Sequence, residues 1–239
     1  ALYQKAANSK GKELGLAQQI VDLLVLDNVI VTMDALHCQP ETQAKIVKKK
    51  GDFIVQVKAN QRTLYAFAQE QFKAVYERPD LPQCEQKNQG HGRKEMRTVM
   101  QIDANLPPAL KQRWPHVKTF IEVASERTLN GETHCDSRWY ASSLPVDPAQ
   151  AAYAIRRHWG IENELHWILD VAFNEDDSLK TAGNAARNYS VMNRIALNRI
   201  KQNKWKKRGV KGSQKNAAWN KDYLVKLTFE FNSTPAKEI

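Results

Sequence analysis

Val29-Ile30-Val31-Thr32-Met33-Asp34 is the stretch of sequence that decides the fold. Its first five residues are apolar or β-branched, which is typical of a buried strand in a parallel sheet. A second such run lies at residues 53–57. Helices are predicted before, between and after the two runs, at 13–26, 39–50 and 62–76. Because strands and helices alternate, we expect an α/β fold in which the two strands are parallel neighbours.

The pattern changes after residue 84. Strand-like stretches follow at 94–102, 117–127 and 134–142, and Asn130-Gly131 between the last two is a strong hairpin signal. We interpret residues 1–84 as the first part of an α/β core and residues 85–146 as a β-rich insertion. Helical patterns are found at 148–170 and 184–202. We therefore interpret residues 147–203 as the second part of the α/β core. Residues 204–239 are expected to form a basic, loosely ordered tail.

The formal net charge of +10 indicates a polyanionic partner. Between Arg199 and Lys226 there are ten basic residues and one acid, so the rest of the chain is close to neutral. A basic segment beside a near-neutral body fits an enzyme that holds DNA phosphates. The alternative is a solvated segment that serves solubility.

Composition argues against several classes of protein. No apolar run is long enough to span a bilayer and the first residues lack a signal-peptide pattern, so we expect a cytoplasmic, nucleoid-associated protein without membrane contact. The cysteines number three and form no CxxC pair, which gives neither a disulfide framework nor a zinc site a basis.

Two segments carry residues suited to catalysis. Asp34 follows a buried strand at its C-terminal end, where catalytic groups gather in open α/β sheets, although a helix N-cap is the alternative. In the helical segment 158–167, Glu162 shares a face with His158 and His166. Two such carboxylates suit Mg²⁺-dependent phosphodiester chemistry, in which metal ions activate the nucleophile and stabilise the leaving oxygen.

Four motifs together resemble a known family. They are Val-Thr-Met-Asp-Ala-Leu-His-Cys-Gln at 31–39, Val-Lys-Ala-Asn-Gln at 57–61, Gly-His-Gly-Arg at 90–93, and His-Trp-Gly-Ile-Glu-Asn-Glu-Leu-His-Trp at 158–167 followed by Leu-Asp-Val-Ala-Phe-Asn-Glu-Asp-Asp-Ser at 169–178. In this order they are similar to the H-repeat-associated transposases of bacterial insertion sequences, which are DDE-type enzymes. The similarity extends from about Ala1 to Lys201.

The resemblance implies an RNase H-like fold, with a five-stranded mixed sheet flanked by helices and a β-rich insertion before the last catalytic helix. It makes Asp34 the second acid of the catalytic triad and Glu162 the third. Related transposases often carry an arginine and a lysine around that glutamate, where this chain has His158 and Leu169.

No residue matches the family's first aspartate, because Asp22 falls within a predicted helix and Asp27 in the loop after it. Residues 1–7 match the third strand of the fold, so the first two N-terminal strands are expected to be missing. A truncated, inactive product is the hypothesis that follows.

DNA contacts are predicted at three places. Lys58, Asn60 and Gln61 follow the second strand at the same sheet edge as Asp34, with a plain strand-to-helix turn as the alternative. His91, Arg93, Lys94 and Arg97 form a basic loop, or else an ordinary charged hairpin. The third group, next to Glu162, consists of His158, Trp159 and Asn163, where an aromatic ring suits unstacked bases.

The sequence therefore predicts a transposase that cleaves DNA at element ends and joins it to target DNA. Asp34, Glu162 and a missing aspartate would hold two Mg²⁺ or Mn²⁺ ions, with double-stranded DNA as the partner and a homodimer as one option. The rivals are an inactive remnant that retains only DNA binding, a metal-dependent nuclease without strand joining, and a basic nucleic-acid-binding module.

Overall fold

Two short parallel strands form the start of the sheet, as the sequence predicts. In the computed structural model, β1 (Ile30–Met33) pairs with β2 (Asp52–Val57) in parallel. Phe53, Ile54 and Val55 are all buried although successive residues of a strand point to opposite faces. Both faces of β2 are therefore covered, which explains why its sequence is apolar without alternation. The structure describes residues 13–90, 93–129, 131–160, 165–180, 182–202 and 208–230. The strand predicted at residues 1–7 lies outside the described residues.

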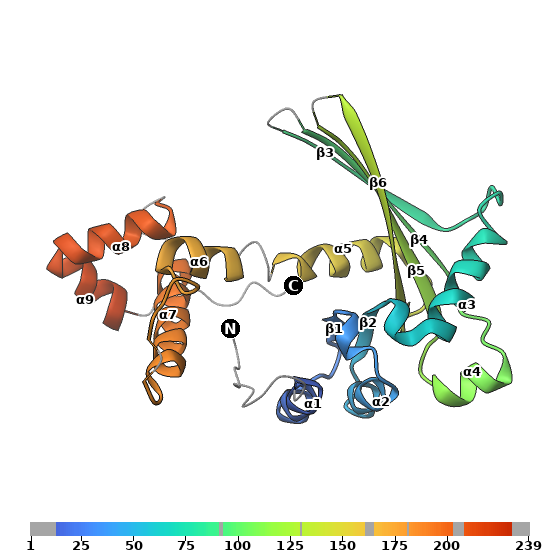
Figure 1. The fold of residues 1–239 in the computed structure, drawn as a ribbon, viewed down its shortest axis with the longest axis horizontal. Coiled ribbons are helices and arrows are strands. Elements are labelled where there is room, and N and C mark those ends of the chain that lie inside the picture. Colours follow the sequence, from blue (N-terminus) through green and yellow to red (C-terminus); the bar gives the residue numbers. More distant parts are fainter. Residues whose placement is uncertain are drawn as a thin grey trace. The chain divides into compact units, whose positions relative to one another are not determined.

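Four longer strands extend this pair into one mixed sheet (Figure 1). The order is β1-β2-β6-β5-β4-β3, in which β6 pairs antiparallel with β2 and each further pair is antiparallel. The added strands are β3 (Gln83–Gly90), β4 (Arg93–Asp103), β5 (Thr119–Leu129) and β6 (Glu132–Ser142). The predicted α/β class with an RNase H-like mixed sheet flanked by helices is confirmed.

The strands within residues 85–146 continue the sheet that β1 and β2 begin. For this reason the sheet has six strands within the described residues, one more than the resemblance implies. The predicted hairpin is confirmed, because Leu129 pairs with Glu132 and Gly131 has a positive φ of 87°. β3 was not predicted, since its polar sequence was interpreted as a break between elements.

Each face of the sheet has its own core. One face is covered by α1 (Glu13–Leu23), α2 (Pro40–Lys48), α3 (Arg62–Lys73) and α4 (Pro108–Arg113), and its buried residues include Val21, Ile46, Phe53, Phe72, Trp114 and Phe120. On the other face, α5 (Pro148–His158) packs Ala151 and Ile155 against Ile54, Ile121 and Tyr140. The periodic apolar faces of these helices supply both cores.

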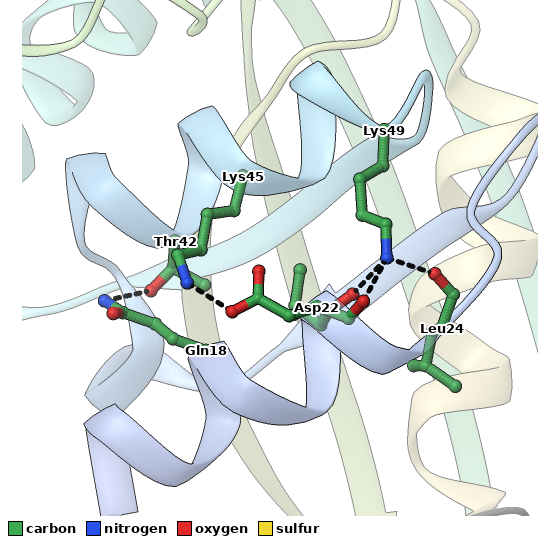
Figure 2. Close-up of polar contacts among 7 residues, drawn as sticks. Gln18, Asp22, Leu24, Thr42, Lys45 and Lys49 are labelled. Carbon is green, nitrogen blue, oxygen red and sulfur yellow. Dashed lines mark hydrogen bonds and ion pairs between the residues drawn. The ribbon is translucent and has the colours of Figure 1, made fainter.

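Polar contacts join α1 to α2 (Figure 2). Gln18 donates to Thr42 Oγ1 at 3.3 Å, and Lys45 Nζ lies 2.6 Å from Asp22 Oδ2. Lys49 Nζ donates to carbonyl oxygens at the C-terminal end of α1, those of Val21 (3.0 Å), Asp22 (2.6 Å) and Leu24 (2.5 Å). One lysine thereby donates to three carbonyl groups at a helix end, where carbonyls lack the regular intrahelical donor.

The internal contacts divide the chain into two units. Residues 7–159 form the sheet unit, and residues 160–239 with 1–6 form the helical unit. The helical unit contains α6 (Trp167–Phe173), α7 (Ala185–Gln202), α8 (Val210–Trp219) and α9 (Lys221–Phe229). Its buried apolar residues are Leu169, Leu197, Ile200 and Leu227. No helix within the described ranges is long and apolar enough to cross a membrane.

Two predictions about helices differ from the structure. The helix predicted over 148–170 is described as α5 and α6, with residues 161–164 outside the described residues. The segment predicted to be loosely ordered contains α8 and α9. Its order has a tertiary cause: the Arg199 guanidinium donates to the carbonyl oxygens of Leu227, Thr228 and Glu230 at the end of α9, where Leu227 is also buried.

Candidate active site

Asp34 is held at the sheet edge with its carboxylate exposed. It follows β1 directly, precedes a short 3₁₀ turn at Ala35–His37, and makes no side-chain capping hydrogen bond. The side chain is 60% exposed, and His37 Nε2 lies 3.9 Å from its Oδ1. The N-cap alternative therefore lacks the hydrogen bond that defines it, and the carboxylate is accessible to a cation.

The turn after β2 lies beside the turn after β1, because parallel strands end at the same edge. Asn60 Nδ2 donates to Ala35 O at 2.6 Å, and Gln61 Nε2 donates to Cys38 O at 2.8 Å. Each of these two side-chain amides thus donates an N–H that holds the second turn against the first. Lys58 is exposed at the same edge. Of the three residues predicted here, Lys58 is the one whose side chain is best placed for phosphate.

Cys38 is part of the core beneath these turns. It is fully buried, and burial raises the pKa of its thiol to about 12. The Cys38 thiol is therefore part of the apolar core and not of the exposed edge around Asp34.

The end of α5 lies against the strand that leads to Asp34. His158 Nδ1 is 3.1 Å from Thr32 Oγ1, and Thr32 precedes Asp34 by two residues on β1. Residues two apart on a strand share a face, so His158 lies on the face to which Thr32 and Asp34 belong. Sequence analysis missed Thr32, because its partner lies 126 positions away.

Trp159 also has an intramolecular partner. The guanidinium carbon of Arg138, on β6, lies 4.6 Å from the centroid of the Trp159 ring. This cation–π contact occupies one face of the indole. Glu162 and Asn163, the remaining predicted residues of this segment, lie outside the described residues.

The predicted basic loop at 90–97 is mostly strand. Residues 93–97 lie in β4, where Lys94 is exposed and the guanidinium of Arg97 forms an ion pair with the Glu95 carboxylate. His91 lies outside the described residues. The pairing with Glu95 offsets the charge of Arg97, so the hairpin is less basic than its sequence suggests.

Glu175, in a second acidic segment, forms an ion pair within the fold. Glu175 Oε1 lies 2.8 Å from the Arg194 guanidinium. Burial alone would raise the pKa of Glu175, but hydrogen bonds from Arg194 and Ser190 outweigh it and hold the pKa below its usual value. Within the described residues no group of three His, Cys, Asp or Glu side chains could hold a metal ion. Among the residues that the structure describes, Asp34 therefore belongs to no cluster of three such side chains.

These observations define a metal-compatible carboxylate at the C-terminal edge of an RNase H-like sheet. The sequence profile of the family described as "Transposase DDE domain" matches residues 3–199. The chain belongs to this transposase DDE domain family.

Three relatives from Escherichia coli show the same relationship. YncI of strain O157:H7, which is named as a transposase, is 34% identical over 95% of this chain and 59% of its own length. From strain K12, YbfL is 32% identical, and YhhI, named as an H repeat-associated transposase, is 31% identical; both alignments cover 94% of this chain and 61% of the relative. The chain therefore spans about three fifths of the length of these relatives.

Proposed function

We propose that this chain is part of a transposase that cleaves DNA at the ends of an insertion sequence and joins the 3′-hydroxyl to target DNA. The observation that carries the proposal is the exposed carboxylate of Asp34, which ends a buried strand and serves no capping role. Membership of the transposase DDE domain family supports the same chemistry.

Two carboxylates of the chain are assigned to Mg²⁺ or Mn²⁺ binding, namely Asp34 and Glu162. Glu162 follows His158 by four residues, and the hydrogen bond between His158 and Thr32 holds the end of α5 on β1, the strand that precedes Asp34. The ions, two in the intact enzyme, would activate the attacking oxygen and stabilise the leaving oxygen. Lys58, exposed at the same edge, is assigned to a DNA phosphate.

The first acid of the triad is assigned to no residue of this chain, and we therefore expect residues 1–239 alone to cleave no DNA. Activity is expected from a chimera in which the N-terminal part of a full-length relative, with its first aspartate, is fused ahead of this chain. The alternative function is DNA binding without catalysis.

Strand cleavage and strand joining by the chimera, with Mg²⁺ or Mn²⁺, distinguish the two functions. Asp34→Asn and Glu162→Gln should each lower both activities about a thousand-fold, since each removes a metal ligand. Asp27→Asn, which removes an exposed carboxylate from a loop, is the matched control and should leave both unchanged. A chimera that stays active as Asp34→Asn would contradict the assignment, and one that only binds DNA would favour the alternative.

A further inference from the structure

Helix α8 has one face packed in the helical unit and one face in solvent. It contacts α6, α7 and α9. Ser213 on the inner face is 4% exposed, and Val210 and Ala217, three and four residues away, are half-buried beside it. Lys211, Lys215 and Trp219 are all exposed and follow one another at intervals of four. At 3.6 residues per turn they form a stripe on the opposite side, which we call the α8 stripe.

The charge of the α8 stripe is uncompensated. No described residue forms an ion pair with Lys211 or Lys215, and the first turn of α8 contains no acid. Lys211 lies in that first turn, with the exposed Arg208 just before it. The helix dipole is positive at this end, so cations here oppose helix stability. Local stability does not explain this placement, whereas an anionic ligand does.

Trp219 ends the stripe with its side chain almost entirely in solvent. It is 83% exposed, the largest exposed aromatic surface among the described residues. Proteins bind single-stranded nucleic acid through exposed aromatic rings that lie beside cationic side chains. Lysines track the phosphates, and the ring stacks on a base that no complementary strand covers. A duplex would use the lysines but not the ring, because its bases are stacked on one another.

We propose that the α8 stripe binds single-stranded DNA, with Lys211 and Lys215 on phosphates and Trp219 stacked on an unpaired base. Successive residues of the stripe rise about 6 Å along the helix, which suits contacts spread along one strand. The inference extends the proposed function, in which DNA is the partner, to a second surface that lies outside the candidate active site. It requires neither metal nor catalysis.

The test measures binding of the 239-residue chain to a fluorescent single strand and to the matching duplex, by anisotropy, without divalent metal. Lys211→Gln/Lys215→Gln should weaken single-strand binding at least ten-fold and lower the salt slope by about 1.4, since each phosphate contact contributes about 0.7. Lys48→Gln/Lys73→Gln, which removes two exposed lysines from the sheet unit, is the matched control and should change affinity less than two-fold.

The second arm isolates the ring. Trp219→Ala should weaken single-strand binding about five- to hundred-fold and duplex binding less than two-fold, while Trp219→Phe restores most of the single-strand affinity. Tyr153→Ala, which removes an exposed aromatic ring from α5, is the control. Equal effects on both DNAs, no effect on either, or a change of oligomeric state with Trp219→Ala would overturn the proposal. Failure of the chimera to cleave DNA, with single-strand binding by the 239-residue chain intact, would count only against the proposed function.

Discussion

At the scale of single residues, Gln101 connects the sheet to the helix that covers it. The side chain is fully buried on β4; its Nε2 donates to Thr119 Oγ1 at 2.9 Å and to Pro145 O at 3.0 Å, and its Oε1 accepts from Asp147 N at 2.9 Å. Asp147 in turn caps α5, because its Oδ1 accepts from Gln150 N. One amide therefore fixes the start of α5 on the sheet.

Gln101→Met should lower the free energy of unfolding by about 2–4 kcal/mol, measured by urea denaturation. The volume is nearly kept, but Thr119 Oγ1 loses a buried donor, and the Asp147 N–H and the Pro145 carbonyl lose their partner at part-buried contacts. Gln150→Ala, at an exposed helix position, should stay within about 0.5 kcal/mol of the wild type. Equal stabilities for the two variants would show that the Gln101 hydrogen bonds contribute nothing net.

Tyr76 and Glu122 form a second, part-buried polar contact. Tyr76 Oη donates to Glu122 Oε2 at 2.6 Å, and Glu122 is 3% exposed. Burial, together with the hydrogen bond and the charge of Glu122, raises the pKa of Tyr76 well above its ordinary value of 10. The folded protein therefore holds this proton more tightly than the unfolded chain does.

The raised pKa of Tyr76 determines how the stability of the protein depends on pH at this group. The contribution of the Tyr76 proton is fully present below pH 10, the pKa of an unfolded tyrosine, and is lost as pH rises above it toward the folded pKa. Between pH 9 and 11.5 the unfolding free energy of the wild type should fall more steeply than that of Tyr76→Phe. Tyr153→Phe, with a 59% exposed side chain, should behave as the wild type. Parallel curves for all three proteins would refute the assignment.

At the scale of elements, the attachment of α1 depends on Lys49. Lys49→Met keeps the aliphatic stem but removes the donor to three carbonyl groups at the end of α1. We expect amide hydrogen exchange within α1 to accelerate about five- to thirty-fold, which corresponds to roughly 1–2 kcal/mol of local opening free energy. Lys48→Met, at the exposed neighbouring position, should leave exchange in α1 unchanged. Faster exchange in α2 instead would show that Lys49 stabilises its own helix.

Elements were predictable where local pattern and tertiary contacts agree. The apolar runs of β1 and β2 and the Asn130-Gly131 turn belong to this class. β3 does not: Gln83–Gly90 is polar and its order comes from pairing with β4 along its whole length. An edge strand needs only one neighbour and little burial, so its sequence carries little strand pattern.

At the scale of the whole molecule, each unit has buried apolar residues of its own. Leu197 is fully buried in the helical unit, and Phe120 is fully buried in the sheet unit. Leu197→Ala should lower stability by about 2–5 kcal/mol and accelerate hydrogen exchange in α6 to α9, with β2 and β5 unaffected. Phe120→Ala should accelerate hydrogen exchange in β2 and β5 and leave exchange in α6 to α9 unaffected. Exchange that accelerates equally in both units would show that they unfold as one.

The candidate site was predictable only in part. Asp34 follows from a local rule, because a carboxylate at the end of a buried strand can be identified from its own neighbours. Thr32 and Arg138 could not be found in this way, since their partners, His158 and Trp159, are brought to them by the packing of α5. The structural use of the Asn60 and Gln61 amides also depends on two turns meeting in space.

Ile30–Met33 is the outermost strand on its side of the described sheet, and its far edge pairs with no other described strand. Its main-chain amides and carbonyls can therefore receive one more strand, and a strand added in parallel would finish next to Asp34. Whatever completes this border would place its last side chains beside that carboxylate. Under the metal-binding role proposed for Asp34, a strand received at this border would supply the neighbouring ligands.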